Sequence, residues 1–473
     1  MDGRPFDTVA RALDRAGIID PRRFRETFDL AWPRIVTGLA IMSKSTVDLA
    51  LVGWDVGTAA VAGLAFANVY WQVGKFLGIG LAGGTVTLVS QAYGAEDSAR
   101  ASAAVGVSLA VALVVAAPIA TAYAAFAPEL VAVFGSEPEP LRHAATYLAL
   151  VAPALLFEFP NLIASRTYAG VGDTLTPMVV RAGGALANVV LSVVLIFGYG
   201  FGVAGAAAGT SLATGVVALV FAWGLSGRSY FGRGTCPVAV TRATTRFEGA
   251  VPLTRRLLAV SAPLMARRTA EMLVAFPLVA IAATFGPAVV AAYEVARRVR
   301  TLIDSFSWGF SIAASTLVGQ RLGAGDAADA EAYARAIVRL SATVYVVATT
   351  AVLALSGRIA GLFVDDPAVV AVAGPFVAAA AVSVAFLGVD GSATGTLRGA
   401  GDTRYPFLTS LFGRYGCALP VAALGLVTPL GATALLVAMV VESAVPAGLN
   451  VARVRSNRWK AIGRAHAAAG ADD

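Results

Sequence analysis

The chain has 473 residues, of which 58% are hydrophobic and 14% are charged, whereas a soluble domain carries about 25% charged residues. This composition excludes an ordinary water-soluble domain and makes the lipid bilayer the expected environment. The net charge of +7 does not indicate nucleic-acid binding, because the basic residues lie mostly in loops between apolar segments. Two cysteines and two histidines, in no ligand spacing, predict no metal site and no cofactor.

Twelve segments are apolar enough to cross a bilayer as helices, each near the required length of about 20 residues or longer. In chain order they are 30–52, 60–91, 101–127, 144–168, 175–198, 203–226, 256–284, 289–320, 332–356, 369–398, 405–425 and 430–452. They predict an all-α integral membrane protein with five parts. These are an N-terminal segment (1–29), a six-helix lobe (30–226), a linker (227–255), a second six-helix lobe (256–452) and a tail (453–473).

The flanking segments predict the orientation of the spans. The N-terminal segment is rich in arginine interleaved with acids and has no apolar signal-peptide core, so it predicts a short amphipathic helix. The linker and the tail are also basic, whereas the turns near 53–59, 199–202, 285–288 and 426–429 contain no lysine or arginine. Basic loops stay in the cytoplasm, so both termini are expected there.

Two motifs each occur twice, 229 residues apart. "TLVSQAYGAED" (87–97) returns as "TLVGQRLGAGD" (316–326), and "GVGDTLTP" (170–177) returns as "GAGDTRYP" (399–406). Pro33 and Pro263, which open spans 1 and 7, are 230 residues apart. The chain is therefore expected to contain two six-span halves of the same orientation, which is a parallel repeat.

The motifs also have a local structural interpretation. Gly94 and Gly323 fit the position just after a helix, where a left-handed backbone is common. Asp173 and Asp402 fit helix N-caps. These residues are therefore expected to shape turns rather than to bind a ligand.

The doubled motifs, the sequence "STVDLALVG" in span 1 and the 6+6 organisation resemble the multidrug and toxic compound extrusion (MATE) transporters. The resemblance covers about residues 30–452. It is nearer to the archaeal and DinF-like branch, with one NorM-type feature. It implies a V-shaped pair of six-helix lobes, alternating access, and export of a small organic compound in exchange for H⁺ or Na⁺.

Other classes fit less well. The turn "QAYGAEDSAR" lacks the basic motif that major facilitator transporters carry after span 2. A lipid-linked precursor flippase of the same superfamily commonly has fourteen spans, and it stays an alternative. The two-lobe repeat argues against a receptor or a channel. A membrane enzyme is not indicated, because the sequence has no histidine cluster, metal-ligand spacing or nucleophile elbow.

Polar residues inside spans are costly, so each is a candidate for function. In the first lobe the family resemblance assigns cation coupling to Asp48, Asn188 and Thr210, and a second family aspartate is replaced by Ser192. Loss of that carboxylate weakens the case for Na⁺, because hard cations prefer charged oxygens. Lys44, one helical turn before Asp48, is expected to share its helix face and act as a counter-charge.

The second lobe and the expected cleft have their own candidates. Glu271 matches a functional glutamate of NorM-type members, and Arg267 lies one turn before it. The aspartate that NorM-type members carry on span 10 falls at Leu387 here, with Asp390 one turn away. Further candidates for the substrate cleft are the repeat counterparts Lys75 and Asp304, which would pair across the two lobes, and Glu158, Trp71 and Trp308.

The sequence therefore predicts a monomeric antiporter in the cell membrane that exports small amphipathic compounds. Cationic or zwitterionic substrates are the first expectation. An organic anion is the alternative, because cations such as Lys44, Lys75 and Arg267 also lie within the spans.

Overall fold

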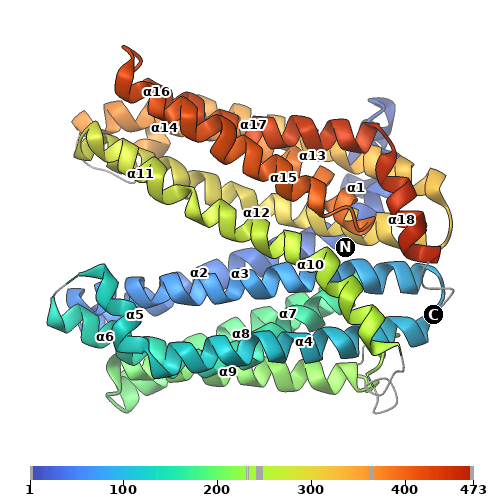
Figure 1. Cartoon of the computed structure of the whole chain (residues 1–473), viewed down its shortest axis with the longest axis horizontal. Helices are drawn as coiled ribbons and strands as arrows, with labels where there is room; N and C mark the ends of the chain where they lie inside the picture. The colour runs from blue at the N-terminus through green and yellow to red at the C-terminus, as the bar shows by residue number, and fades with distance from the viewer. Residues whose placement is uncertain are drawn as a thin grey trace. The chain divides into compact units, whose positions relative to one another are not determined.

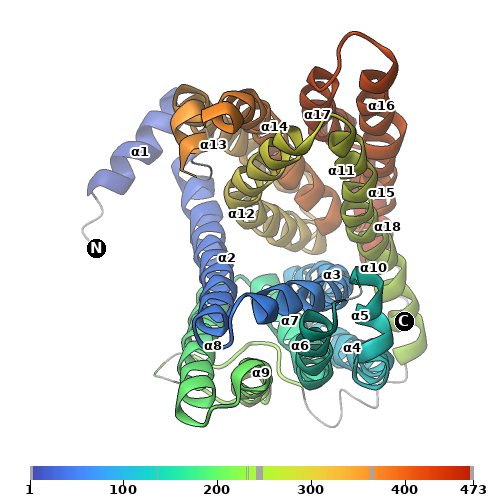
Figure 2. The same cartoon turned by 90° about the vertical axis from the view of Figure 1, so that its left-hand side faces the viewer.

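The computed structural model describes residues 4–135, 137–230, 232, 234–240, 249–362 and 367–468. Every regular element in these ranges is a helix (Figures 1 and 2). The chain forms two compact units: the N-terminal unit, Val36–Met265, and the C-terminal unit, which combines Met1–Ile35 with Ala266–Asp473. These units differ from the expected lobes, because each boundary falls inside a helix.

Both boundaries lie two residues after a proline. They divide α2 (Pro21–Asp55) after Pro33 and α10 (Ala250–Leu273) after Pro263. Proline inside a helix removes one backbone hydrogen bond and bends the helix. The segment before Pro33 is tied to the C-terminal unit, where Arg23 Nη2 lies 2.7 Å from Asp329 Oδ1. The segment before Pro263 is tied to the N-terminal unit, where Ser261 Oγ donates to the Leu81 carbonyl at 3.1 Å.

The N-terminal unit is built around α3 (Thr58–Gly94), which packs against α4, α6 and α7. Its other helices are α4 (Ser98–Ala125), α5 (Ala127–Val131), α6 (Pro138–Val151), α7 (Leu155–Gly170), α8 (Leu175–Val193), a π-helical turn (Val194–Gly198) and α9 (Gly202–Leu225). Leu81, Leu155, Phe159 and Ile163 are fully buried between them.

The C-terminal unit is built around α12 (Pro287–Gly323) and α14 (Pro367–Gly399), which pack closely. Its other elements are α1 (Arg4–Arg15), α11 (Ala275–Thr284), α13 (Ala327–Gly361), α15 (Arg404–Leu411), a π-helical stretch (Phe412–Ala418), α16 (Leu419–Val427), α17 (Thr433–Arg455) and α18 (Arg458–Ala468). Small residues permit the close approach. A Cβ added at Gly395 would lie 2.4 Å from the Ser311 carbonyl oxygen, and Gly391 and Gly399 meet Ser307 and Ser315 in the same way.

Ten helical segments of the described chain are long and apolar enough to cross a membrane, and they match ten of the twelve expected spans. The other two, 256–284 and 289–320, are also helical, but neither contains a single helix that is both long and apolar enough. The first is interrupted at Val274, between α10 and α11. The second is α12, which carries Glu294, Arg297, Arg298, Arg300 and Asp304. Arg300 belongs to the polar network described below, and Arg297 donates to Glu294 at 2.9 Å.

Asp173 has the expected capping role, because it accepts from the Thr176 N–H at the start of α8 at 2.9 Å. Asp402, the other expected cap, accepts from the Arg453 side chain at 2.8 Å. Two further caps were not expected: Asp97 and Asp326 accept hydrogen bonds from the backbone N–H groups of Arg100 and Asp329, each at 2.9 Å.

The expected place of the left-handed residue was wrong. Gly94 and Gly323 are the last residues of α3 and α12. The positive φ angles fall two residues later, at Glu96 (59°) and Gly325 (79°). There the chain closes its turn, and the N–H groups of Asp97 and Asp326 reach back into the last helical turn.

The N-terminal segment contains the expected amphipathic helix as α1, whose Ala10 is buried while most of its neighbours are exposed. The helix of the first span begins earlier than expected, at Pro21. Its charged first turns belong to the same helix as the apolar span.

Candidate functional site

A buried polar site lies in the N-terminal unit where α2, α8 and α9 meet. Asp48 is only 5% exposed, and Lys44 Nζ lies 3.2 Å from its Oδ2. The two side chains are four residues apart, which places them on one face of α2. Ser192 Oγ, from α8, donates to the other carboxylate oxygen at 3.3 Å.

Asn188 and Thr210 complete this site. In the amide orientation that satisfies both neighbours, the Asn188 nitrogen donates to Asp48 Oδ1 at 3.0 Å and its oxygen accepts from Thr210 Oγ1 at 3.0 Å. Lys44 Nζ also donates to Thr210 Oγ1, at 3.4 Å. The ammonium group therefore has two partners, one charged and one neutral.

Local backbone features of α8 and α9 allow this convergence. A Cβ at Gly209 would lie 2.8 Å from Ser192 Oγ and 3.0 Å from its nitrogen, so α9 can approach α8 closely only with glycine there. Directly after Ser192 and Val193, the helix widens into the π-helical turn Val194–Gly198. Such widened turns are frequent at functional sites.

A second buried ion pair lies in the same unit. The two oxygens of Glu158 (α7) accept from Arg181 (α8) at 2.7 and 2.9 Å, and both side chains are almost fully enclosed. Lys75 and Lys44 also lie within electrostatic range of Glu158. The sequence indicated Glu158 but not Arg181. The signal was available, because Arg181 lies two turns before Asn188 on the same helix.

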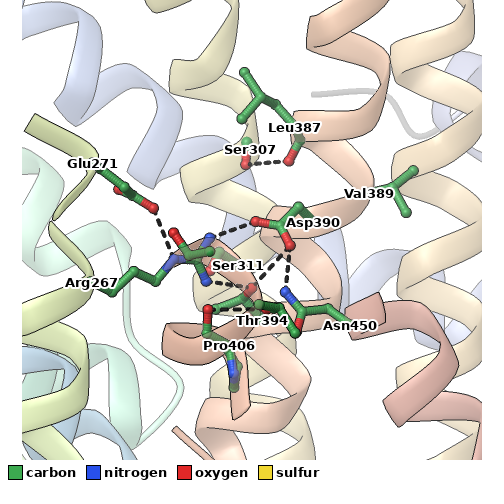
Figure 3. Close-up of polar contacts among 12 residues, drawn as sticks. Arg267, Glu271, Ser307, Ser311, Leu387, Val389, Asp390, Thr394, Pro406 and Asn450 are labelled. Carbon is green, nitrogen blue, oxygen red and sulfur yellow. Dashed lines mark hydrogen bonds and ion pairs between the residues drawn. The ribbon is translucent and has the colours of Figure 1, made fainter. Parts of the chain in front are cut away.

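The C-terminal unit brings Arg267, Glu271 and Asp390 together (Figure 3). Arg267 donates from Nε to Glu271 at 2.8 Å, from Nη2 to Asp390 at 2.5 Å, and from Nη1 to Thr394 at 2.8 Å. Asn450 Nδ2 donates to the second oxygen of Asp390 at 2.6 Å. Asp390 therefore joins this network. Leu387, the position that matches the family aspartate, contributes only its carbonyl, which accepts from Ser307.

The network continues to residues that sequence reasoning missed. Arg414 links Glu271 (3.5 Å) to Glu442 (3.2 Å). Arg300 forms a forked pair with Glu442 at 2.9 and 3.0 Å. A signal existed, because Arg414 and Glu442 are charged residues inside the apolar segments 405–425 and 430–452.

The remaining candidates each have partners within their own unit. Trp71 packs against apolar core residues of the N-terminal unit, beside Val151. Asp304 accepts from Trp308 Nε1 at 3.2 Å. Two guanidinium groups lie over the Trp308 ring, those of Arg34 at 5.3 Å and Arg268 at 5.9 Å from its centroid. The expected pairing of Lys75 with Asp304 stays a prediction.

The Asp48 site and the C-terminal network hold their carboxylates with different cations. In the C-terminal unit Glu271, Asp390 and Glu442 are held by guanidinium groups, which do not lose their proton in proteins. In the N-terminal unit Asp48 is held by a lysine ammonium, a point charge on a flexible stem. Of these four carboxylates, Asp48 therefore has the counter-charge that can move away most easily.

Comparison with known proteins gives one consistent result. The MatE family model matches residues 33–194 and 263–424, once in each half. A probable multidrug resistance protein NorM of Rhodopseudomonas palustris is 30% identical over 440 residues, covering 90% of each chain. The multidrug resistance protein PmpM of Pseudomonas aeruginosa is 28% identical over 409 residues, covering 85% of this chain and 84% of PmpM.

Solved structures show the same fold. A crystal structure described as MATE in the straight conformation superposes with a TM-score of 0.85 at 20% sequence identity, covering 93% of this chain and 97% of that chain. Both copies of the family model begin at the prolines that divide α2 and α10. The chain therefore belongs to the MATE family and is a multi-pass membrane protein with two repeated halves.

Proposed function

We propose that the chain is an antiporter that exports small amphipathic organic compounds in exchange for protons. Family membership and the multidrug resistance names of its relatives support the export activity. We further propose that the protein lies in the plasma membrane as a monomer, with both termini in the cytoplasm.

The observation that carries the coupling proposal is the contact between Lys44 and Asp48. At about 4 Å and an effective dielectric of about 20, such a pair gains roughly 4 kcal/mol. Uptake of a proton by Asp48 removes this attraction. Thr210 already contacts the ammonium at 3.4 Å and can keep it as a neutral partner. Proton uptake thus exchanges one partner of Lys44 for another, which biases a two-state equilibrium.

The same contact favours H⁺ over Na⁺ as the coupling ion. A sodium site needs several oxygen ligands and gains from charged ones. Here Ser192 stands where a second carboxylate would be, and the Lys44 ammonium lies where a monovalent cation would bind. A cation that enters this site must first displace an internal cation.

Reconstituted protein tests the proposal. Wild type should accumulate a fluorescent cationic or zwitterionic dye under an imposed pH gradient and not under a Na⁺ gradient alone. Asp48→Asn should abolish gradient-driven accumulation while the protein stays folded. Asp55→Asn, which removes an exposed carboxylate at the end of the same helix, is the matched control and should transport normally.

Normal export by Asp48→Asn, together with loss of export in Glu271→Gln, would contradict the proposal and would place coupling in the C-terminal unit. Because removal of one partner of a buried ion pair can destabilise a protein by about 3–5 kcal/mol, thermal unfolding of Glu271→Gln must be measured alongside. A lipid-linked precursor flippase would instead translocate a labelled lipid and ignore the dyes.

A further inference from the structure

The C-terminal unit contains a second group of cations, one of which, Arg268, forms an ion pair with Glu271 of the network described above. Arg34 comes from α2, Arg268 from α10 and Arg398 from α14. All three lie close to α12. Arg34 and Arg268 lie over the ring of Trp308, and Arg398 donates to the Ser311 carbonyl at 2.9 Å and to Ser315 Oγ at 3.2 Å.

The close helix packing described above produces this arrangement. Gly309 allows α2 to touch α12, because a Cβ there would lie 2.7 Å from the Ala31 carbonyl oxygen. This contact brings Arg34 onto Trp308, the residue before Gly309. On the other side of α12, Gly395 and Gly399 admit Ser311 and Ser315, which hold Arg398.

The group carries more positive than negative charge. Arg398 lies within electrostatic range of Arg34, Arg267 and Arg268, all of the same sign. The carboxylates among the residues described around them are Glu271, Asp304 and Asp390. Four guanidinium groups therefore face three carboxylates. An excess charge inside a membrane-spanning unit is unfavourable, so one further negative charge is favourable there.

The group is also accessible. The Arg268 side chain is 35% exposed and uses one nitrogen, Nη1, on Glu271 Oε2 at 2.9 Å. Trp308 and Arg34 are half-buried. Arg267, by contrast, is 10% exposed and uses its Nε and both terminal nitrogens on neighbours.

We infer that Arg268, Arg34 and Trp308 form a binding site for the anionic group of a planar aromatic compound, such as an aryl carboxylate. The guanidinium fork of Arg268 matches a carboxylate in geometry and charge. The ring of Trp308 and the planar guanidinium groups offer stacking surfaces for an aromatic frame. The inference rests on the proposed export function. It selects the zwitterionic and anionic substrates over simple cations.

Three probes with one ring system and different charges test the site. They are 2-naphthoate (anion), 2-naphthamide (neutral) and 2-naphthylmethylammonium (cation), each radiolabelled and bound at equilibrium to purified full-length protein. Wild type should bind the anion at least about tenfold more tightly than the neutral amide, which is the effect of one charge-assisted hydrogen bond.

Two variants locate the anion. Arg268→Gln should weaken the binding of naphthoate about tenfold or more. It should leave the affinity for the neutral amide unchanged and should not lower the affinity for the cationic probe. Arg268→Lys should restore part of the preference, because it keeps the charge but not the fork. Arg34→Gln is the second variant and is expected to act in the same direction, so the test does not depend on the folding of one protein. Arg358→Gln removes an exposed cation of the same unit and should change nothing.

Equal binding of the three probes by wild type would overturn the inference. So would equal weakening of all three probes by Arg268→Gln in a protein of wild-type thermal stability. The measurement needs no ion gradient, so it is separate from the export test. A protein that exports under a pH gradient but fails the binding test keeps the proposed function and loses only the anion site.

Discussion

Each half of the chain places a cation four residues before a carboxylate on its first helix. The pairs are Lys44–Asp48 on α2 and Arg267–Glu271 on α10. Arg267 is fixed by three hydrogen-bonding neighbours, whereas Lys44 has one ion-pair partner and one hydroxyl partner. A guanidinium whose forked N–H groups are all bonded is a rigid ion-pair partner, whereas an ammonium on a flexible four-carbon stem is a movable one. Similar spacing therefore gives a fixed ion pair in one half, whereas in the other it gives the movable ion pair on which the coupling proposal rests.

Removal of the lysine should change the pH profile of export. The ammonium of Lys44 favours the charged form of Asp48, so Lys44→Met should let the carboxylate take up a proton at higher pH. We expect the pH of half-maximal export to rise by about one to three units, the usual effect of one nearby opposite charge. Initial export rates measured across a pH series in proteoliposomes check this. Arg142→Met, which removes an exposed cation on α6, serves as the control, and an unchanged midpoint in Lys44→Met would contradict the coupling role.

The sequence predicted which residues meet at the Asp48 site of the N-terminal unit. Helical spacing placed Lys44 beside Asp48, and the family resemblance placed Asn188 and Thr210 with it. It did not predict that Arg181 pairs with Glu158, or that Arg414 bridges Glu271 and Glu442. Span boundaries give the depth of a residue but not the rotation of its helix. The widened π-helical stretches beside Ser192 and at Phe412–Ala418 rotate the following residues further from ideal spacing.

Helix packing in the C-terminal unit depends on glycines spaced four residues apart along α14. Gly395→Ala should place a methyl group 2.4 Å from the Ser311 carbonyl, and such overpacking costs about 1–3 kcal/mol. Gly374→Ala is the matched control, because it lies on the same helix with nothing within 4 Å of the new Cβ. It should stabilise by up to about 1 kcal/mol through helix propensity. Thermal unfolding in detergent should therefore move in opposite directions for the two variants, and equal shifts would contradict the packing argument.

The helices themselves were predicted better than their ends. Hydropathy located twelve helical spans, but it started the first at residue 30, whereas α2 begins at Pro21. Polar residues such as Arg22 and Glu26 end an apolar window without ending a helix, because they find partners on α12 and α13. The hydropathy pattern also did not predict the break at Val274, since residues 275–284 continue the apolar pattern. Tertiary contacts, not local propensity, set these limits.

In the whole molecule the order of helices and turns is repeated in the two halves, whereas the charged side chains are not. Both halves begin with a proline-divided helix and repeat the same two turns, which is why a 229-residue offset predicted the architecture. The charged side chains do not follow the repeat. Asp304, for example, has Lys75 as its counterpart, and Trp308 has Ile79. A repeat in sequence therefore predicts the fold of both halves but leaves the chemistry of each to be found separately.

The positions of the basic residues predict how the spans are oriented in the membrane. Arginines are concentrated in residues 227–255 and in the N- and C-terminal segments, whereas the turn at 53–59 has no lysine or arginine. Because positively charged loops resist translocation, both termini and the linker should lie in the cytoplasm. A reporter enzyme that is active only outside the cytoplasm should be silent when fused at residue 240 and active when fused near residue 57. A reporter that is active only inside should give the reverse pattern at the same two sites. Activity of the first reporter at both sites would contradict the orientation, and it would also require an even number of spans between them instead of the five expected.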